Sequence, residues 1–366
     1  MGKIRILFTS DDFKTRHWAK ELEKSGCEVI LNPTDRLRYL NNLLKFARPL
    51  IRQYLQGKKI HVFIFRYLND SKHLRVSLEF LLRDILTIIL CKLCNVRMIW
   101  LLHNIDKETI EHFPGITKMR RALVKLASSR VLVTDPLLID YAVQYGIERE
   151  RVDWICFGRP VYGTPDLRNI HLHQQISDFK NTLRSRGMKN IITGLCVSAK
   201  ADKKAHYLYA DTIVGKCSLH EDTCVILVLI GDFPEGGDFV DAKKRAMESP
   251  WILLIEESFP VDESYIADQI DFFYRSMTDW SVAYSLYVAS DQEKPVITHR
   301  HGALSDIVEK ESIGYVIDDS ETDIPAYIAR SLSTWDHHPA FLDIRSWETG
   351  AQRLNNTILK TGVKQF

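Results

Sequence analysis

The sequence predicts an α/β protein of two domains, each a doubly wound parallel sheet. Short apolar runs of strand length alternate along the chain with segments in which apolar residues recur three and four positions apart. The length of 366 residues suits two domains of ordinary size. The composition, 45% hydrophobic and 26% charged, is that of a globular protein. We place the domains at 1–160 and 189–340. Residues 161–188 are expected to be a linker that includes a lead-in helix, and 341–366 a closing helix that packs back on the first domain.

Composition also bounds the cellular setting. No uninterrupted run of 18 apolar residues occurs, so we expect no membrane-spanning helix. The opening GKIRILFTSDD reads as a strand, without the apolar core of a secretory signal. Seven cysteines at irregular spacing favour reduced thiols. We expect a cytoplasmic protein.

The net charge of +2 conceals a strong asymmetry between the two halves. Residues 1–165 hold 28 lysines and arginines against 17 acidic residues, whereas the rest holds 21 against 30. A basic half suggests a polyanionic partner. Nucleic acid is not favoured, because the basic residues are interleaved with long aliphatic side chains rather than with stacking aromatics.

The first domain opens with a β-α-β unit. Residues 3–10 form a strand, 13–25 a helix and 27–31 a second strand. Asp11 and Asp12 follow the first strand, where an open α/β sheet meets its ligands. Either carboxylate can instead cap the helix that follows.

Residues 36–59 form a basic amphipathic segment, which Pro49 kinks or breaks. Leucines at helical spacing are interleaved there with Arg36, Arg38, Lys45, Arg48 and Arg52. Binding to an anionic membrane surface and packing as a helix with a solvated basic face are both open. The apolar helix expected at 74–94 contains Cys91 and Cys94, which we interpret as core residues rather than as a redox or zinc pair.

His103 ends the strand at 96–102. A histidine at the carboxyl end of a parallel strand is placed for acid–base work or hydrogen bonding. The alternative is a structural histidine that bonds a loop. A further strand at 130–134, a helix at 136–145 and a strand at 152–155 complete the first domain.

The second domain begins with a strand at 191–197, followed by a basic loop and a helix over 205–213. Lys200, Lys203 and Lys204 in this loop can grip phosphates at a helix N-terminus, or they can simply be solvated. The apolar run 225–231 has the composition of a central parallel strand and ends at Gly231-Asp232.

The stretch 270–318 organises this domain. A strand at 270–273 leads into Tyr274-Arg275-Ser276, a helix follows at 282–289, and a short strand at 296–297 precedes His301-Gly302-Ala303 and another helix. A glycine turn between a strand and a helix N-terminus is a ready anion site. An ordinary crossover with a basic turn is the plainer interpretation.

Several segments, in order, resemble the GT-B glycosyltransferases, in particular the family-four-like enzymes of bacterial polysaccharide assembly. PVITHRHGALSDIV and FFYRSMTDWSVAYSLYVAS are similar to the part of that family that holds the donor diphosphate and ribose. WLLHN resembles its "HN" motif, and VILVLIGDF the turn near the nucleotide base. The resemblance implies a GT-B fold, with a cleft between two Rossmann-like domains. The chain departs from the family in two places: it lacks a pair of glutamates spaced eight apart, and TSDD replaces a glycine-rich loop.

The resemblance also implies which residues act. The nucleoside-diphosphate sugar is a substrate, and no further cofactor and no metal is expected. Its expected ligands are Lys200, Lys203, Lys204, Gly231, Asp232, Tyr274, Arg275, Ser276, His301, Gly302 and Ala303. Asp11, Asp12 and His103 are the candidate bases of an inverting transfer, which we favour over retention.

The acceptor expected from this resemblance is a polyprenyl-linked glycan at the inner face of an anionic membrane, in exopolysaccharide or capsule assembly. Two alternatives stay open. One is a pyruvyl-type transferase on the same frame, and the other is a degenerate homologue that serves as a scaffold. A periplasmic binding protein is disfavoured, because no secretory signal is expected.

Overall fold

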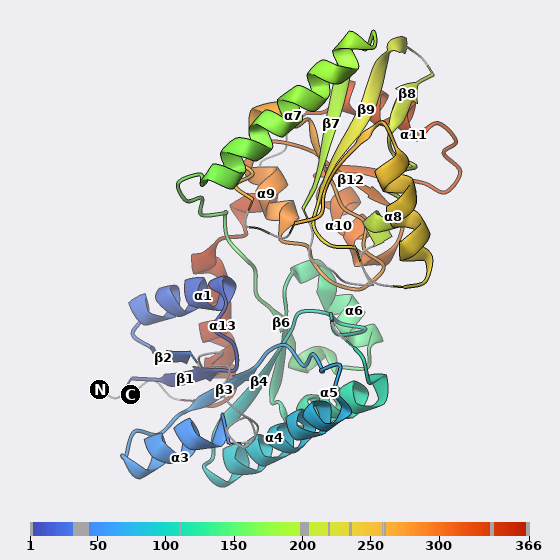
Figure 1. The fold of residues 1–366 in the computed structure, drawn as a ribbon. Helices are drawn as coiled ribbons and strands as arrows, with labels where there is room; N and C mark the ends of the chain where they lie inside the picture. Colours follow the sequence, from blue (N-terminus) through green and yellow to red (C-terminus); the bar gives the residue numbers. More distant parts are fainter. Residues whose placement is uncertain are drawn as a thin grey trace. The chain divides into compact units, whose positions relative to one another are not determined.

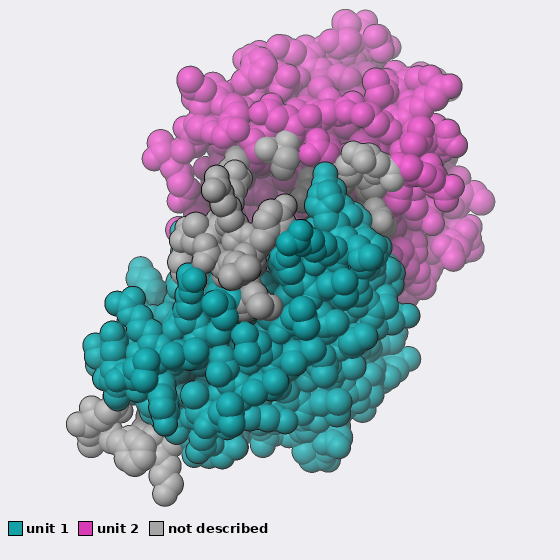
Figure 2. All heavy atoms as spheres, turned by 60° about the horizontal axis from the view of Figure 1, so that its bottom comes forward, with its two compact units in different colours: residues 1–158, 280–282, 345–366 teal, residues 159–279, 283–344 magenta. Residues whose placement is uncertain are grey.

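The computed structural model describes residues 3–31, 44–109, 111–197, 205–218, 220–233, 236–257, 259, 261–336 and 340–363. The predicted basic segment at 36–59 is described only from residue 44 onwards. The chain forms two compact units, teal and magenta in Figure 2. Unit 1 comprises 1–158, 280–282 and 345–366, and unit 2 comprises 159–279 and 283–344.

Unit 1 contains a six-stranded sheet in the order β2-β1-β3-β4-β5-β6, parallel throughout. Its strands are β1 (Arg5–Phe8), β2 (Glu28–Leu31), β3 (Val62–Phe65), β4 (Arg97–Leu102), β5 (Arg130–Val133) and β6 (Val152–Trp154). Its helices are α1 (Phe13–Lys24), α3 (Ala47–Leu55), α4 (Leu74–Leu93), α5 (Pro114–Ala127), α6 (Ile139–Gln144) and α13 (Trp347–Lys360). Helix α1 packs beside α13, and α4 packs beside α3 and α5, so that the two groups cover opposite faces of the sheet (Figure 1).

The closing helix α13 belongs to unit 1 because its entry is fixed there by a buried ion pair. Arg345 donates from Nε to Asp135 across 2.8 Å, and both side chains are fully buried. Trp347 then lies edge-on to Trp18 of α1, 6.0 Å between ring centroids. Such contacts tie residues 210 positions apart into one core.

Unit 2 contains a seven-stranded sheet in the order β10-β9-β7-β11-β12-β13, with β8 antiparallel on β9. Its strands are β7 (Asn190–Val197), β8 (Gly215–Cys217), β9 (His220–Ile230), β10 (Ile252–Ile255), β11 (Phe272–Tyr274), β12 (Val296–His299) and β13 (Gly314–Ile317). Its helices are α7 (Leu167–Ser185), α8 (Asp238–Glu248), α9 (Ser285–Asp291), α10 (Gly302–Lys310), α11 (Ile324–Ser333) and α12 (Ala340–Asp343).

The near-continuous apolar run of β9 reflects burial on both faces. Cys224 and Ile226 pack with Leu183 of α7, whereas Val225 and Leu227 belong to the cluster that includes Ala242 of α8. Successive side chains of a strand point to opposite faces, so a strand covered on both sides needs no polar alternation. Figure 1 shows α7 and α8 on either side of this strand.

The prediction of two doubly wound α/β domains is confirmed. Four local predictions differ from the structure. The helix over 205–213 is wrong: only a 3-10 turn at Ala205–Tyr207 forms, and Tyr207, Ala210 and Ile213 are spaced like a helix face because they all enter the core. The helix placed at 282–289 begins only at Ser285, since 280–282 belong to unit 1.

The region 161–188 contains the expected lead-in helix, α7, but it belongs to unit 2 rather than forming a separate linker. Pro49 neither kinks nor breaks a helix, because it lies in the first turn of α3, where its missing N–H costs no hydrogen bond. Among the described residues, no helix is both long and apolar enough to cross a bilayer.

Candidate functional site

The strand order of unit 2 locates a ligand crevice. The order β10-β9-β7-β11-β12-β13 places β7, the first strand of the unit, beside β11, so the direction of winding reverses between β7 and β11. Ligands of open α/β sheets bind beyond the carboxyl ends of the strands at such a switch point. Arg275 directly follows β11, and its Nη1 lies 3.5 Å from Sγ of Cys196, near the carboxyl end of β7. Its Nε donates to Oγ of Ser285 across 2.8 Å, so the half-buried guanidinium is held at the switch point.

The glycine turn predicted as an anion site is sterically specific. Gly302 has φ +64°, and a Cβ there would lie 2.3 Å from the Met277 carbonyl oxygen and 2.7 Å from that of Asp279. Only glycine fits this close approach without a shift of the backbone. The Ala303 N–H is already bonded to the Asp279 carbonyl at 3.2 Å. Any anion at this helix N-terminus must therefore use the other N–H groups of the first turn.

Buried polar atoms without a partner gather near the ends of β11 and β12. Oγ of Ser276, Nε2 of His299, Nε2 of His301 and the hydroxyl of Tyr274 have no hydrogen-bond partner in the described part of the chain. Burial, and then the neighbouring His301, lower the pKa of His299 to about 4, so its ring is neutral at pH 7. Orphaned buried polar atoms are rare in folded proteins and mark places where a ligand can complete the hydrogen bonding.

The other predicted donor ligands fall in different places. Gly231 directly follows β9, has φ +128° and donates its N–H to the Ile255 carbonyl, and Asp232 is exposed. Tyr274 is fully buried, and burial raises its pKa well above the usual value, so the ring is part of the core. The three predicted lysines 200, 203 and 204 lie outside the described residues.

Glu263 is a site residue that sequence reasoning missed. It lies in the loop after β10, where burial raises its pKa to about 7, and the nearby Arg275 only partly opposes that shift. A carboxylate with a strongly raised pKa beside a crevice is a functional candidate. No sequence pattern surrounds it, and only the fold brings it near Arg275.

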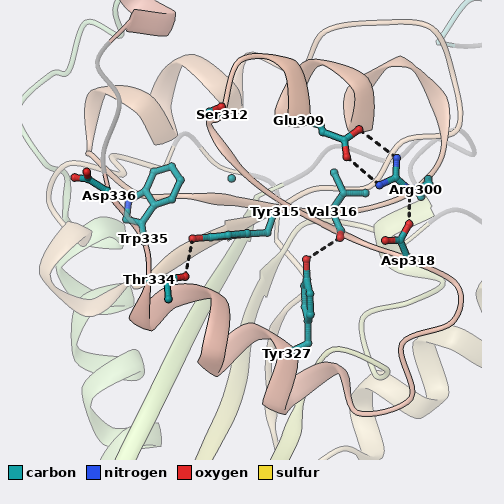
Figure 3. A pocket seen from close by; sticks show the side chains of 11 residues that line it. Arg300, Glu309, Ser312, Tyr315, Val316, Asp318, Tyr327, Thr334, Trp335 and Asp336 are labelled. Carbon is teal, nitrogen blue, oxygen red and sulfur yellow. Dashed lines mark hydrogen bonds and ion pairs between the residues drawn. The ribbon is translucent and has the colours of Figure 1, made fainter.

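A cavity of unit 2 lies away from these residues. It measures about 420 Å³ and lies along the outer edge of β13, between the ends of α10 and α11 (Figure 3). Arg300 lines it, but its guanidinium is paired with Glu309 and Asp318, which leaves little charge for a phosphate. Of the predicted donor ligands that the structure describes, none lines this cavity.

In unit 1 the switch point lies between β1 and β3, and Arg66 occupies it. This arginine directly follows β3 and is fully buried. Its Nη1 donates to Oδ2 of Asp12 and to Oγ1 of Thr15, and its Nε donates to Nε2 of His103 across 2.9 Å. Sequence analysis did not single out Arg66. The signal was a lone cation directly after the buried run IHVFIF.

The two acidic residues after β1, Asp11 and Asp12, have different partners. Asp12 caps α1, accepting from the N–H groups of Lys14 and Thr15, so the capping alternative describes it. Burial opposes ionisation of Asp12, but the Arg66 charge and these hydrogen bonds outweigh it and lower the pKa. Asp11 pairs with Arg16 at 2.7 Å, and that hydrogen bond lowers its pKa.

His103 is held by rings as well as by Arg66. Its imidazole stacks on Tyr67, with centroids 4.8 Å apart and planes 4° from parallel, and it lies 5.7 Å from the Phe157 ring. Arginine has no acceptor, so Nε2 of His103 must accept and the neutral ring carries its proton on Nδ1. The structure thus brings Asp12 and His103 onto one guanidinium, while Asp11 stays apart.

The described residues contain no group of three or more histidine, cysteine or acidic side chains placed to hold a metal ion. All seven cysteines are free thiols. Cys91 is fully buried and Cys94 half-buried, in keeping with core positions rather than a redox pair.

Comparison with known proteins identifies the fold. No protein-family profile matches the sequence, and no curated protein matches it. Among solved structures, HepE from Anabaena in complex with UDP and glucose is similar over 98% of this chain and 100% of its own, with a TM-score of 0.63 and 16% identity. The catalytic domain of starch synthase IV from Arabidopsis thaliana, bound to ADP and acarbose, matches with a TM-score of 0.61 and 11% identity over 99% of each chain.

The lipopolysaccharide outer core galactosyltransferase WaaB matches with a TM-score of 0.57 and 10% identity, over 98% of this chain and 99% of its own. At these identities the likeness concerns the fold. The chain has the GT-B fold, two Rossmann-like α/β domains, as the resemblance in the sequence implied.

Proposed function

We propose that this protein is a glycosyltransferase that moves a sugar from a nucleoside-diphosphate sugar to an acceptor hydroxyl. The observation that carries the proposal is the switch point of unit 2. There Arg275 is fixed at the carboxyl end of β11, and unpartnered polar atoms of Ser276 and His301 lie beside the Gly302 turn. The solved structures with this fold include complexes with UDP and with ADP, which supports a nucleotide at this place.

The chemistry requires that negative charge on the leaving diphosphate be stabilised. Arg275 and the free N–H groups at the start of α10 supply positive potential without a metal. Lys200 and Lys204 of the preceding loop complete this set in our proposal. His299 and His301 contribute as neutral donors or acceptors, since burial lowers the pKa of each ring.

For an inverting transfer a base must deprotonate the acceptor, and we keep Asp11, Asp12 and His103 as its candidates. Asp12 is a weak base in this state, because Arg66 lowers its pKa. The Nε2 lone pair of His103 is occupied by Arg66. Asp12→Asn retains a cap residue but removes the charge, so a fall in transfer rate of about 10²-fold or more with α1 intact supports base catalysis.

We place the acceptor, a polyprenyl-linked glycan of exopolysaccharide or capsule assembly, at an anionic membrane surface. Large apolar side chains are exposed at helical spacing on α4 and again on α3: Leu74, Leu78, Leu82, Ile89 and Leu93, with Ile51, Tyr54 and Leu55. Arg48 and Arg52 of α3 are exposed beside them. Exposed apolar side chains with interleaved cations suit insertion into a headgroup region.

The first experiment measures thermal stabilisation of the full chain by a panel of nucleoside diphosphates and their sugars. A ligand at 100 times its dissociation constant adds about 2.7 kcal/mol. We expect one nucleotide to stabilise the protein, and Lys204→Ala and Arg275→Ala to abolish the shift. Arg330→Ala, an exposed arginine of α11, is the matched control.

The results separate the alternatives. Stabilisation by no nucleotide contradicts the proposal and favours a pyruvyl-type transferase. Nucleotide binding without turnover on any acceptor favours the scaffold.

Membrane contact has its own test. Combined charge reversal of Arg38, Lys45 and Arg48 should weaken sedimentation with anionic vesicles, whereas reversal of Lys243 and Lys244 on α8 should not. Equal binding of both variants removes the membrane from the proposal.

A further inference from the structure

A second cavity lies at the switch point of unit 1. It measures about 230 Å³ and is lined by the ends of β1 and β3, the start of α3 and the middle of α4. The lining side chains that matter here are Ser10, Lys45, Phe46, Phe80, Arg83 and Asp84. Ligand pockets for whole small molecules have about 300–1,000 Å³. This cavity therefore suits one group of a larger ligand.

The described residues that line this cavity carry more positive than negative charge. Oδ1 of Asp84 accepts from Nε and Nη2 of Arg83, both at 3.3 Å, and Oδ2 accepts from Nε of Arg120 at 2.7 Å. Asp84 and Arg120 are fully buried, and the Arg83 side chain is 14% exposed. Two guanidinium groups thus share one carboxylate in a poorly solvated place. Lys45 also lines the cavity, and Arg66 is paired with Asp12.

Two further observations show that this charge is under-compensated. Nη2 of Arg120 is buried without a hydrogen-bond partner in the described part of the chain. Burial and the nearby positive charge of Arg120 lower the pKa of Arg83, although the Asp84 carboxylate opposes that shift. A buried cation is costly unless an anion balances it.

Arg83 is also held ready to bind. Its guanidinium carbon lies 5.0 Å from the Phe46 ring centroid and 4.7 Å from that of Phe80. Cation–π contact with two rings fixes the guanidinium plane, so little side-chain entropy remains to be lost when it forms a bidentate contact. A planar guanidinium matches the oxygens of a phosphate group.

We propose that this cavity binds a phosphate or diphosphate group of the acceptor, with Arg83 and Lys45 as its principal contacts. That this phosphate belongs to the acceptor rests on the proposed glycosyl transfer, whereas the anion site itself does not depend on that function. Leu78 and Leu82 lie on another face of α4 and are exposed, since residues two positions apart on a helix do not share a face, so the helix that lines the cavity also presents apolar side chains to the surface. A phosphate attached to a lipid matches both features.

The test titrates the full chain with inorganic pyrophosphate by calorimetry at low salt. Arg83→Gln should weaken binding at least about tenfold, since a hydrogen bond to a charged group contributes about 1.5–3 kcal/mol. Arg75→Gln, on the same helix but 79% exposed and outside the cavity, should change the affinity less than about twofold. If Arg83→Gln fails to fold, Lys45→Gln and Arg83→Lys replace it, with the same direction of effect.

Pyrophosphate can also enter the donor site, and Arg275→Ala distinguishes the two. Binding that survives Arg83→Gln and is lost in Arg275→Ala overturns the proposal. Binding lost in Arg83→Gln with the nucleotide shift unchanged supports it. Because the nucleotide shift is measured separately, failure of the glycosyltransferase proposal and failure of the anion site are distinguishable.

The source of the phosphate is tested with two further probes. Neutral phosphatidylcholine vesicles containing polyprenyl diphosphate should sediment the wild type and not Arg83→Gln. A sugar 1-phosphate tests a water-soluble source. Arg83-dependent binding of either probe supports the site and identifies its ligand. Binding of neither probe, together with pyrophosphate binding that Arg83→Gln leaves unchanged, overturns the proposal.

Discussion

Nε of Arg66 donates to Nε2 of His103 across 2.9 Å, and this hydrogen bond joins the carboxyl ends of β3 and β4. Through the same guanidinium Asp12 is connected to His103, although the two residues lie 91 positions apart. Two of the three candidate bases of unit 1, Asp12 and His103, therefore form one charge network, and changing Arg66 must affect both.

Arg66→Gln should lower the free energy of unfolding by about 3 kcal/mol, the low end for a broken buried pair, because Asp12 keeps 33% of its side chain in water. Urea denaturation at pH 7 measures it. Arg16→Gln removes the exposed pair with Asp11 and should cost at most about 1 kcal/mol. Equal losses in the two variants would contradict a buried network.

The loss of stability at low pH gives an independent measurement of the pair between Arg66 and Asp12. The pKa of Asp12 is lower in the folded chain than in the unfolded chain, so the unfolded state binds more protons as the pH falls. The stabilisation is complete above the unfolded pKa and disappears as the pH falls through the folded one. Wild type should thus lose more stability than Arg66→Gln between about pH 5 and pH 2. If the free energy of unfolding fell equally with pH in the wild type and in Arg66→Gln, this expectation would be wrong.

Glu263→Gln should stabilise the protein at alkaline pH. The folded pKa of about 7 lies above that of an unfolded glutamate, so ionisation is unfavourable in the folded chain, and stability falls as the pH rises through 7. We expect a gain of about 2 kcal/mol near pH 8.5 and none near pH 4. Urea titrations at both pH values check this. Glu248→Gln, on an exposed side chain of α8, should show no such pH dependence.

Gly302→Ala should destabilise unit 2 by more than about 1 kcal/mol, because φ +64° is strained for alanine and its Cβ meets two carbonyl oxygens. The shift produced by the best nucleotide should also shrink, since the start of α10 must move. Gly163→Ala, where no atom lies within 4 Å, is the control and should stay within about 0.5 kcal/mol. Thermal melts with and without nucleotide measure both effects.

Arg345→Met should cost about 3–5 kcal/mol, because it leaves Asp135 as an unbalanced buried charge. The double variant Asp135→Asn/Arg345→Met should recover part of that loss, which a double-mutant cycle in urea quantifies. Arg353→Met, which removes the cation–π contact of an exposed arginine with Trp154 at 4.3 Å, should cost about 0.5–1 kcal/mol. An additive cycle would show that the ion pair does not hold α13.

The alternation of apolar runs with helical spacing determined the fold class. Strands such as β9 are recognisable because burial on both faces requires an unbroken apolar run. Helix α1 is recognisable because Leu22 lies three and four positions after Ala19 and Trp18, and all three are buried. Residue spacing led to a wrong prediction at Tyr207, Ala210 and Ile213. These core residues are spaced like one face of a helix, although only a 3-10 turn forms there. The turn at Gly302 could also be predicted from the sequence, because its backbone conformation requires a residue without a side chain.

The site required the tertiary structure. Arg66, Arg83 and Glu263 carry no motif, because their properties arise from partners far away in the chain: His103 for the first, Arg120 for the second and Arg275 for the third. Sequence determines which side chains can be charged and where strands end. Which charges become neighbours, which are buried and which remain unbalanced is decided only when the sheet brings its strand ends together, since burial and Coulomb interaction depend on distance in space.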